Sequence, residues 1–252
     1  AWWHGILLAL IAAKIIYVLV MNLAELLRTA DAFTYALTLA KTTFFDRDHT
    51  DYAMPRNYPK LPGLVMVWFE LARGGWSEYT LNLVYFNYYV AFVVLFYANL
   101  RAAAGRSIAL AGTYVLASLP LLLTHAVMIG YADLPLAVYL TFCGVYAWRY
   151  AREGGRGPLA LALVMALALP FIKTEGKIPY LPLGLFAIGL AAAWRRGVRP
   201  GRLWGVAGVA VAAGIFLIAM LAAVYGEQEP GFLPPRVWAR IRPGYHLDVV
   251  GK

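Results

Sequence analysis

The sequence predicts an all-α integral membrane protein with about seven transmembrane helices, and three observations support this fold class. Hydrophobic residues make up 62% of the 252 residues and charged residues only 14%, whereas soluble domains contain roughly 25% charged residues. Several apolar runs reach about 20 residues, the length at which a helix crosses the hydrocarbon core of a bilayer. Arginines gather in the short segments between these runs. We therefore expect the chain to fold within a membrane.

The apolar runs place the transmembrane helices in order along the chain. They cover residues 3–24, 80–100, 107–127, 132–150, 158–178, 180–194 and 203–225. The run at 180–194 is short, and Pro179 and Pro182 make its ends indistinct because proline lacks a backbone donor. We expect a membrane domain over residues 1–225 and a short outer-face tail over 226–252, a candidate start of a further region.

Lys14 interrupts the first apolar run. The sequence leaves three roles open for it: a side chain that reaches the interface, an ion pair within the bundle, or a break in a longer helix. Because no small-residue cleavage site followed by a soluble domain is recognisable, we interpret the run as a spanning helix and not as a removed signal.

Basic residues predict the orientation of the chain. Three alternate loops contain nine arginines and one acid, Glu153, and loops of this composition face the cytoplasm. The arginines are Arg101, Arg106, Arg149, Arg152, Arg156, Arg195, Arg196, Arg199 and Arg202. The net charge of +9 is thus explained by topology, and no nucleic-acid partner is expected.

Residues 25–79 form the one long loop on the opposite, outer side. Apolar residues recur at helical spacing from Leu26 to Phe44, which predicts an amphipathic helix lying in the membrane interface. After a polar turn over 46–60, the segment LPGLVMVWFELARGG, residues 61–75, predicts a second amphipathic or re-entrant helix that ends at its two glycines.

Ionisable and aromatic candidates for a functional site gather on this outer side. Each has a plain structural explanation, such as a carboxylate at a helix start or a lysine that reaches the interface. Because topology places them all at one membrane face, we expect a shared outward-facing cavity. The candidates are Asp31, His49, Asp51, Arg56, Tyr58, Lys60, Tyr131, Asp133, Lys173, Glu175 and Lys177.

The order of short motifs across about residues 25–180 resembles that of a known enzyme family. The motifs are Asp31-Ala32, HTDY at 49–52, YPKLPGL at 58–64, GYADLPLA at 130–137 and KTEG at 173–176. They resemble those of bacterial GT-C glycosyltransferases, the membrane enzymes related to protein mannosyltransferases and to the lipid A aminoarabinose transferase.

The resemblance implies a GT-C fold that transfers sugar from a polyprenyl-phosphate carrier to a glycan, lipid or protein acceptor. It also implies that the site faces the periplasm of a bacterial inner membrane and that the transfer inverts the anomeric centre, as is usual in the family. Asp31 matches the general base and Asp133 the second acid of the site. The residues implied to bind the substrate or the lipid phosphate are His49, Asp51, Arg56, Tyr58, Lys60, Tyr131, Lys173, Glu175 and Lys177.

Three questions stay open at this stage. Whether a divalent cation bridges Asp31, His49 and Asp133 is undecided, since no spacing is a recognised metal signature. A transporter or flippase for a lipid-linked sugar is the first alternative function. A non-catalytic membrane subunit of a glycosyltransferase complex, which would need a partner subunit, is the second. Membrane lipids are partners under every alternative.

Overall fold

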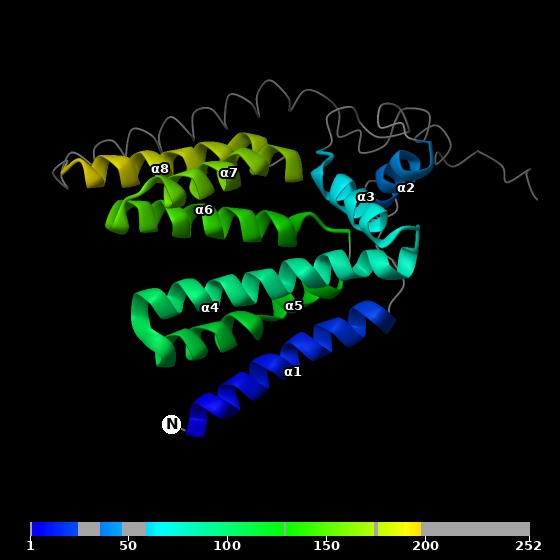
Figure 1. Cartoon of the computed structure of the whole chain (residues 1–252), viewed down its shortest axis with the longest axis horizontal. Helices are drawn as coiled ribbons and strands as arrows, with labels where there is room; N and C mark the ends of the chain where they lie inside the picture. Colours follow the sequence, from blue (N-terminus) through cyan, green and yellow to red (C-terminus); the bar gives the residue numbers. More distant parts are fainter. Residues whose placement is uncertain (1, 25–35, 47–58, 129, 174–175, 198–252) are drawn as a thin grey trace, which may run out of the picture. The chain divides into compact units, whose positions relative to one another are not determined.

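The computed structural model describes residues 2–24, 36–46, 59–128, 130–173 and 176–197. Every regular element among these residues is helical, which confirms the all-α prediction. The elements are α1 (Trp2–Ala24), α2 (Leu37–Asp46), α3 (Leu61–Arg73), α4 (Glu78–Ala117), α5 (Pro120–Val127), α6 (Asp133–Glu153), α7 (Arg156–Ile172), the short π-helix η2 (Gly176–Tyr180) and α8 (Leu181–Arg195) (Figure 1). The chain divides into two compact units, Ala1–Trp204 and Gly205–Lys252, and the described residues all belong to the first.

Two of the described helices, α1 and α4, are long and apolar enough to cross a membrane. Only 17% of the most apolar stretch of α1 and 39% of that of α4 is buried, so neither resembles the buried core helix of a soluble protein. Helices α7 and α8 are apolar but have only 17 and 15 residues. By length and composition, the described residues therefore support fewer spans than the seven predicted, and the predicted span at 203–225 lies outside them.

Two predicted spans differ from the helices that form. The span predicted at 107–127 is interrupted, because α4 ends at Ala117 and α5 begins at Pro120, whose missing N–H favours a new helix start. The span predicted at 158–178 ends early, since Lys173 adopts an extended backbone directly after α7. Within α4, Gly105 has a positive φ of 82° and separates two helical segments.

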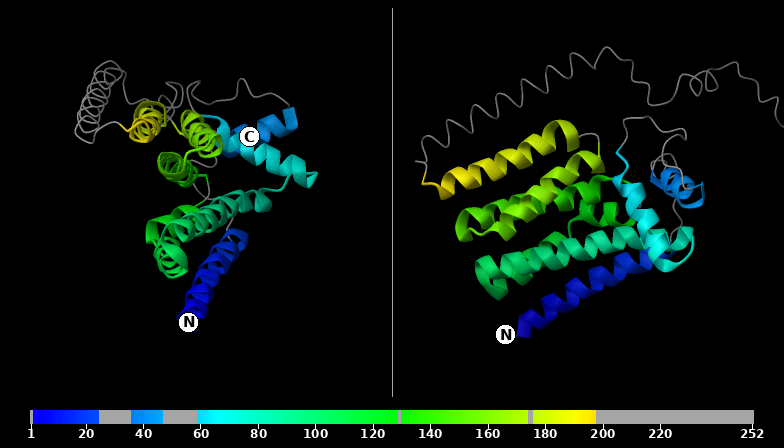
Figure 2. Two further views of the ribbon diagram at one scale, coloured as in Figure 1. Left: turned by 60° about the vertical axis from the view of Figure 1, so that its left-hand side comes forward. Right: turned by 45° about the horizontal axis from the view of Figure 1, so that its top comes forward.

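The long helices pack in two groups that share α4 (Figure 2). Helix α1 packs along α4 and touches α5, while α6 packs against α7, α8 and α4. Small residues bring the second group together: Gly184 of α8 faces the Sγ of Cys143 and the Cβ of Ala166. Close approach at small residues is the usual basis of helix packing in membranes.

Hydrogen bonds join the helix ends at one end of these groups. Asn22 of α1 is fully buried and donates its Nδ2 to the carbonyl of Ala126 in α5 at 3.0 Å. Asn82 of α4 donates its Nδ2 to the carbonyl of Asn22 at 2.9 Å. The end of α1, the start of α4 and the end of α5 therefore meet here, and this is the end from which the predicted outer loop departs.

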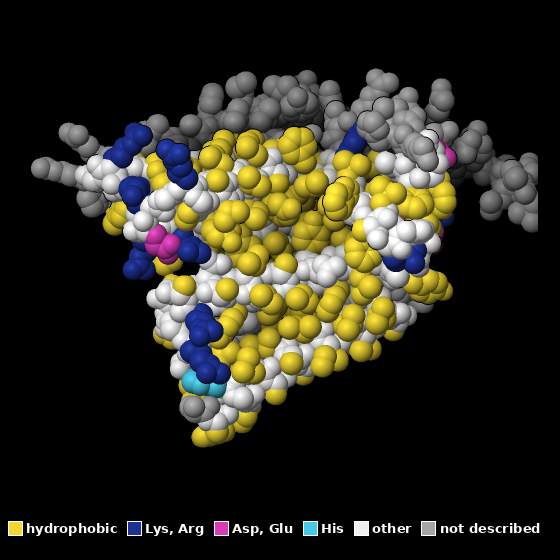
Figure 3. All heavy atoms as spheres, viewed as in Figure 1, with side chains coloured by type: hydrophobic (Ala, Val, Ile, Leu, Met, Phe, Trp, Pro, Cys, Tyr) yellow, Lys and Arg dark blue, Asp and Glu magenta, His cyan; other side chains and the backbone are white. Residues whose placement is uncertain are grey.

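Arginines mark the other end of the same helices. Arg149 of α6 donates to the Oδ1 of Asn99 in α4 at 3.3 Å, and Arg195 of α8 approaches the carbonyl of Tyr150 at 3.5 Å. His4 of α1 contacts Ser107 at 3.0 Å. Lys and Arg side chains gather at these ends, whereas a broad apolar surface covers the helices between (Figure 3). The described arginines of the three predicted loops thus share one end of the helices, whereas Arg73 lies at the turn between α3 and α4.

The two helices predicted for the outer loop are present as α2 and α3, which pack on each other. Helix α3 ends as predicted, because Gly74 has a φ of 86° and donates its N–H to the carbonyls of Glu70 and Leu71. Of the helix predicted from Leu26 to Phe44, residues 26–35 lie outside the described residues. The described part is α2, which runs from Leu37 to Asp46.

A buried carboxylate, Glu70, fixes the turn between α3 and α4. Its side chain has no exposed surface. Oε2 accepts hydrogen bonds from the guanidinium of Arg73 at 3.0 and 3.2 Å and from the backbone N–H of Ser77 at 2.7 Å, while Oε1 accepts from the hydroxyl of Thr80 at 2.9 Å. The charge is therefore fully hydrogen-bonded, as a buried carboxylate must be.

Candidate functional site

The centre of the candidate site is an ion pair between Asp133 and Lys173. Lys173 Nζ lies 2.7 Å from Asp133 Oδ1, and the side chains of Lys173 and Asp133 are 25% and 36% exposed. Asp133 is the first residue of α6, where a carboxylate also complements the helix dipole. Lys173 follows the last residue of α7. Two motifs predicted from the sequence to lie on the same membrane side are thus in direct contact.

Gly176 holds the chain close to the end of α7. Its N–H donates to the carbonyl of Lys173 at 2.9 Å. A Cβ at this position would overlap the backbone carbonyl of Leu169, and backbone atoms cannot move aside as a flexible side chain can. This close approach explains why the KTEG motif ends in glycine.

Gly176→Ala is expected to destabilise the protein by about 1–3 kcal/mol, since the added methyl overpacks against backbone. Gly189→Ala in α8 is the matched control, because a Cβ there meets nothing within 4 Å and alanine favours a helix by up to about 1 kcal/mol. Thermal unfolding in detergent, followed by circular dichroism, measures both. Equal melting temperatures for the two variants would contradict the close approach at Gly176.

A small apolar cluster connects Lys60 with the two residues of the ion pair. Leu61, the first residue of α3, packs on a buried cluster that contains Ala132 and Ile172. These two residues directly precede Asp133 and Lys173 in the chain. Lys60, which directly precedes Leu61, therefore belongs to the same part of the fold as both charged residues.

Tyr131 and His125 contact each other beside the start of α6. Their rings lie edge to face with centroids 5.9 Å apart. The Nδ1 of His125 is buried and has no hydrogen-bond partner among the described residues. In the sequence His125 and Tyr131 both lie close to Asp133, but only Tyr131 was among the predicted site residues.

Several predicted site residues lie outside the described residues. They are Asp31, His49, Asp51, Arg56, Tyr58 and Glu175. Lys177 belongs to η2, but its side chain is also not described. The described part of the chain contains no group of three or more His, Cys, Asp or Glu residues that could hold a metal ion. Since Asp31 and His49 are not among the residues searched, the question of a divalent cation stays open.

An apolar hollow of about 260 Å³ lies between α3 and α4. Tyr88 and Asn87 contribute to it from the aromatic-rich part of α4, and Phe69 contributes from α3. Its lining is almost wholly apolar, so it suits a hydrocarbon chain better than a polar ligand.

No protein-family model, curated protein or solved structure matches this chain. The resemblance to GT-C glycosyltransferases therefore depends on the sequence motifs alone.

Proposed function

We propose that this chain is a membrane glycosyltransferase of the GT-C type. It transfers a sugar from a polyprenyl-phosphate carrier to an acceptor hydroxyl at the periplasmic face of a bacterial inner membrane. The observation that supports this function best is the Asp133–Lys173 ion pair. It joins the GYADLPLA and KTEG motifs, which the resemblance assigns to one site, at the end of α7 near Lys60.

The proposal includes a multi-pass arrangement in the membrane. The spans are α1, the two segments of α4 on either side of Gly105 (the second continued by α5), α6, α7 and α8, with the predicted helix at 203–225 as the seventh. Helix α7 is about 26 Å long at 1.5 Å per residue, close to the thickness of a hydrocarbon core. Support comes from exposed apolar side chains along α1, α4 and α7, and from the arginines at one end.

Helices α2 and α3 would then lie in the outer interface. In α3 the apolar side chains of Trp68 and Leu71 are 77% and 60% exposed, although the opposite face is buried against α2 and α4. Exposed tryptophan is typical of helices at the boundary between lipid and water. The hollow between α3 and α4 offers the lipid tail of the donor a place to lie.

The chemistry follows from the charges assigned to the site. An acceptor hydroxyl is a weak nucleophile, so a carboxylate that accepts its proton assists the attack, and Asp31 takes this role. As the glycosidic bond breaks, the leaving phosphate gains charge, which Lys173 and Lys60 stabilise more in the transition state than in the ground state. Asp133 orients Lys173. A single displacement inverts the anomeric centre.

Proteoliposomes containing the full chain, a panel of polyprenyl-phosphate sugars and candidate acceptors test the proposal. We expect one donor to be consumed with release of polyprenyl phosphate, and Asp31→Asn to lower the turnover about 10²–10⁴-fold, which is the usual contribution of a general base. Asp46→Asn is the control, since Asp46 is an exposed carboxylate at the end of α2 and is expected to leave turnover unchanged.

Two results would refute the assignment. Normal turnover by Asp31→Asn would remove the general base from the proposal. Movement of the donor between the two leaflets without formation of a glycoside would instead identify a transporter.

A further inference from the structure

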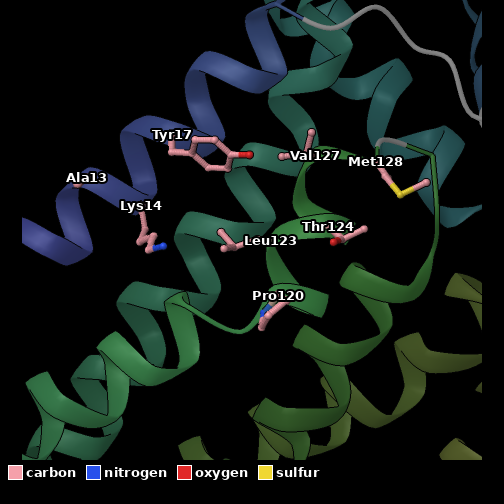
Figure 4. A pocket seen from close by; sticks show the side chains of 8 residues that line it. All are labelled: Ala13, Lys14, Tyr17, Pro120, Leu123, Thr124, Val127 and Met128. Atoms are coloured by element: carbon pink, nitrogen blue, oxygen red, sulfur yellow. The ribbon is translucent and has the colours of Figure 1, made fainter.

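A second hollow lies between the middle of α1 and α5. It measures about 660 Å³ and is open on one side. Lys14 and Tyr17 of α1 extend toward α5, whose Leu123 and Thr124 form part of the opposite wall (Figure 4). The remaining lining residues are Ala13, Pro120, Val127 and Met128.

Lys14 is an unusual residue to find in this hollow. It is the thirteenth of the 23 residues of α1, so it lies about 18 Å from one end of the helix and 15 Å from the other. Its half-buried side chain makes no hydrogen bond or ion pair with any described residue. A charged group at the middle of a bilayer costs at least about 2.5 kcal/mol, and such groups usually face a partner of opposite charge.

The sequence itself offers no partner at this depth. The only acids within the predicted spans are Asp133 and Glu175, and both lie close to a span end. Asp133 is already paired with Lys173. A second copy of this chain would bring another Lys14 to the hollow and not a carboxylate, so self-association through α1 would leave the charge unpaired.

We propose that the hollow between α1 and α5 binds a membrane-spanning helix from outside this sequence, with an Asp or Glu at mid-depth that pairs with Lys14. The inference depends on the membrane arrangement proposed above but not on sugar transfer. Ala13 allows the backbone of a third helix to approach α1 closely, and the hydroxyls of Tyr17 and Thr124 can donate to the same carboxylate.

Depth favours a helix over an anionic lipid as the occupant. The phosphate of a phospholipid stays in the headgroup region, about 15 Å from the middle of the bilayer. An Asp or Glu on a spanning helix can lie at any depth, including that of Lys14. A buried ion pair between helices also fixes their register, which suits assembly with a defined partner.

Cross-linking to a designed peptide tests the inference in phosphatidylcholine vesicles. The probe is a synthetic Leu/Ala-rich spanning peptide with one central Glu and a cysteine one turn away, and its twin has Gln in place of Glu. The peptide is cross-linked to the full protein carrying Ala13→Cys. The matched control is Ala12→Cys, because Ala12 is exposed on α1 next to Ala13 but does not line the hollow. The parent chain measures background from Cys143, which is buried.

At Ala13→Cys we expect at least about threefold more disulfide with the Glu peptide than with the Gln peptide, in line with polar contacts between membrane helices. The preference should vanish when Lys14→Met is added and should be absent at Ala12→Cys. Equal yields from both peptides, or a preference that survives Lys14→Met, would overturn the inference. Protection of Ala13→Cys from a maleimide by phosphatidylglycerol or palmitate, without peptide preference, would assign the hollow to a lipid instead.

The same vesicles separate this inference from the proposed function. Release of the chain by alkaline extraction would refute the membrane arrangement and the helix-binding inference together. Retention in the membrane with no difference between the peptides would refute only the inference. Neither readout requires an active transferase.

Discussion

The charge-swapped variant Asp133→Lys, Lys173→Asp is expected to fold with a loss of at most about 1 kcal/mol, because a lysine then lies at the start of α6, but to transfer sugar about 10²–10³-fold more slowly. The swapped side chains can form the same contact, which is 2.7 Å in the parent. The positive charge would nevertheless move to the start of α6, and a carboxylate would take the place of the proposed phosphate ligand after α7. Losing a preorganised donor to a developing negative charge typically costs that much in rate.

The swap separates two roles that single substitutions confuse. Lys173→Met removes both the partner of Asp133 and the proposed phosphate ligand, so a loss of activity alone would not identify the cause. Because the pair is partly exposed, its contribution to stability is about 0–1 kcal/mol. Thermal unfolding like that of the control swap, together with slow turnover and weak donor binding, therefore identifies a role in the chemistry.

A second ion pair provides the control for this swap. Lys41 of α2 and Glu78 of α4 lie 2.8 Å apart with 54% and 38% of their side chains exposed, and neither belongs to the candidate site. Lys41→Glu, Glu78→Lys, which also places a lysine at a helix start, should lower stability by the same small amount and leave turnover unchanged. If the Asp133–Lys173 swap also transferred sugar at the parent rate, the pair would be purely structural, and the phosphate site would have to lie elsewhere.

The features that the sequence predicted well depend on local signals. An apolar run long enough to span a bilayer predicts α1, and Gly74-Gly75 predict the end of α3, because a left-handed residue there depends on the glycine itself. Asp133 was expected at a helix start and lies there. In each case a few neighbouring residues determine the outcome.

The features that the sequence missed depend on contacts between distant residues. The early end of α7 is coupled to the close approach of Gly176 to Leu169, which apolar periodicity does not reveal. The predicted topology puts Asp133 and Lys173 on one membrane face, but their contact follows from how α6 packs on α7. Glu70 was not chosen as special, since one glutamate in an amphipathic helix usually points to solvent.

Glu70→Ala is the substitution expected to destabilise the described helices most, by about 3–5 kcal/mol. Four hydrogen bonds end on this carboxylate, from two atoms of Arg73, the N–H of Ser77 and the hydroxyl of Thr80. Without it, the partly buried N–H of Ser77 and hydroxyl of Thr80 lose their acceptor, and Arg73, which is 38% exposed, loses its anion. A hydrogen bond to a charged acceptor contributes about 1.5–3 kcal/mol, so the loss of these bonds reaches that range even though the guanidinium of Arg73 stays in contact with solvent.

Two further variants define the reason for the loss. Glu70→Gln keeps the size and one acceptor oxygen, so we expect an intermediate loss of about 1–3 kcal/mol. Glu78→Ala removes a carboxylate from the start of α4 that is 38% exposed, and this change should cost at most about 1 kcal/mol. Thermal unfolding in detergent at one pH, followed by circular dichroism, ranks all three against the parent.

The effect of Glu70 should also reach the candidate site, because the turn that it fixes orients α3. Leu61, at the other end of α3, packs against Ala132 and Ile172 beside the ion pair. A loosened α3 would therefore shift Lys60 relative to Lys173, and donor affinity should fall in Glu70→Gln even at temperatures where the protein stays folded. If Glu70→Gln matched Glu78→Ala in both melting temperature and donor affinity, the turn would be held by Gly74 and the packing of α3 alone, and Glu70 would have no role in positioning Lys60.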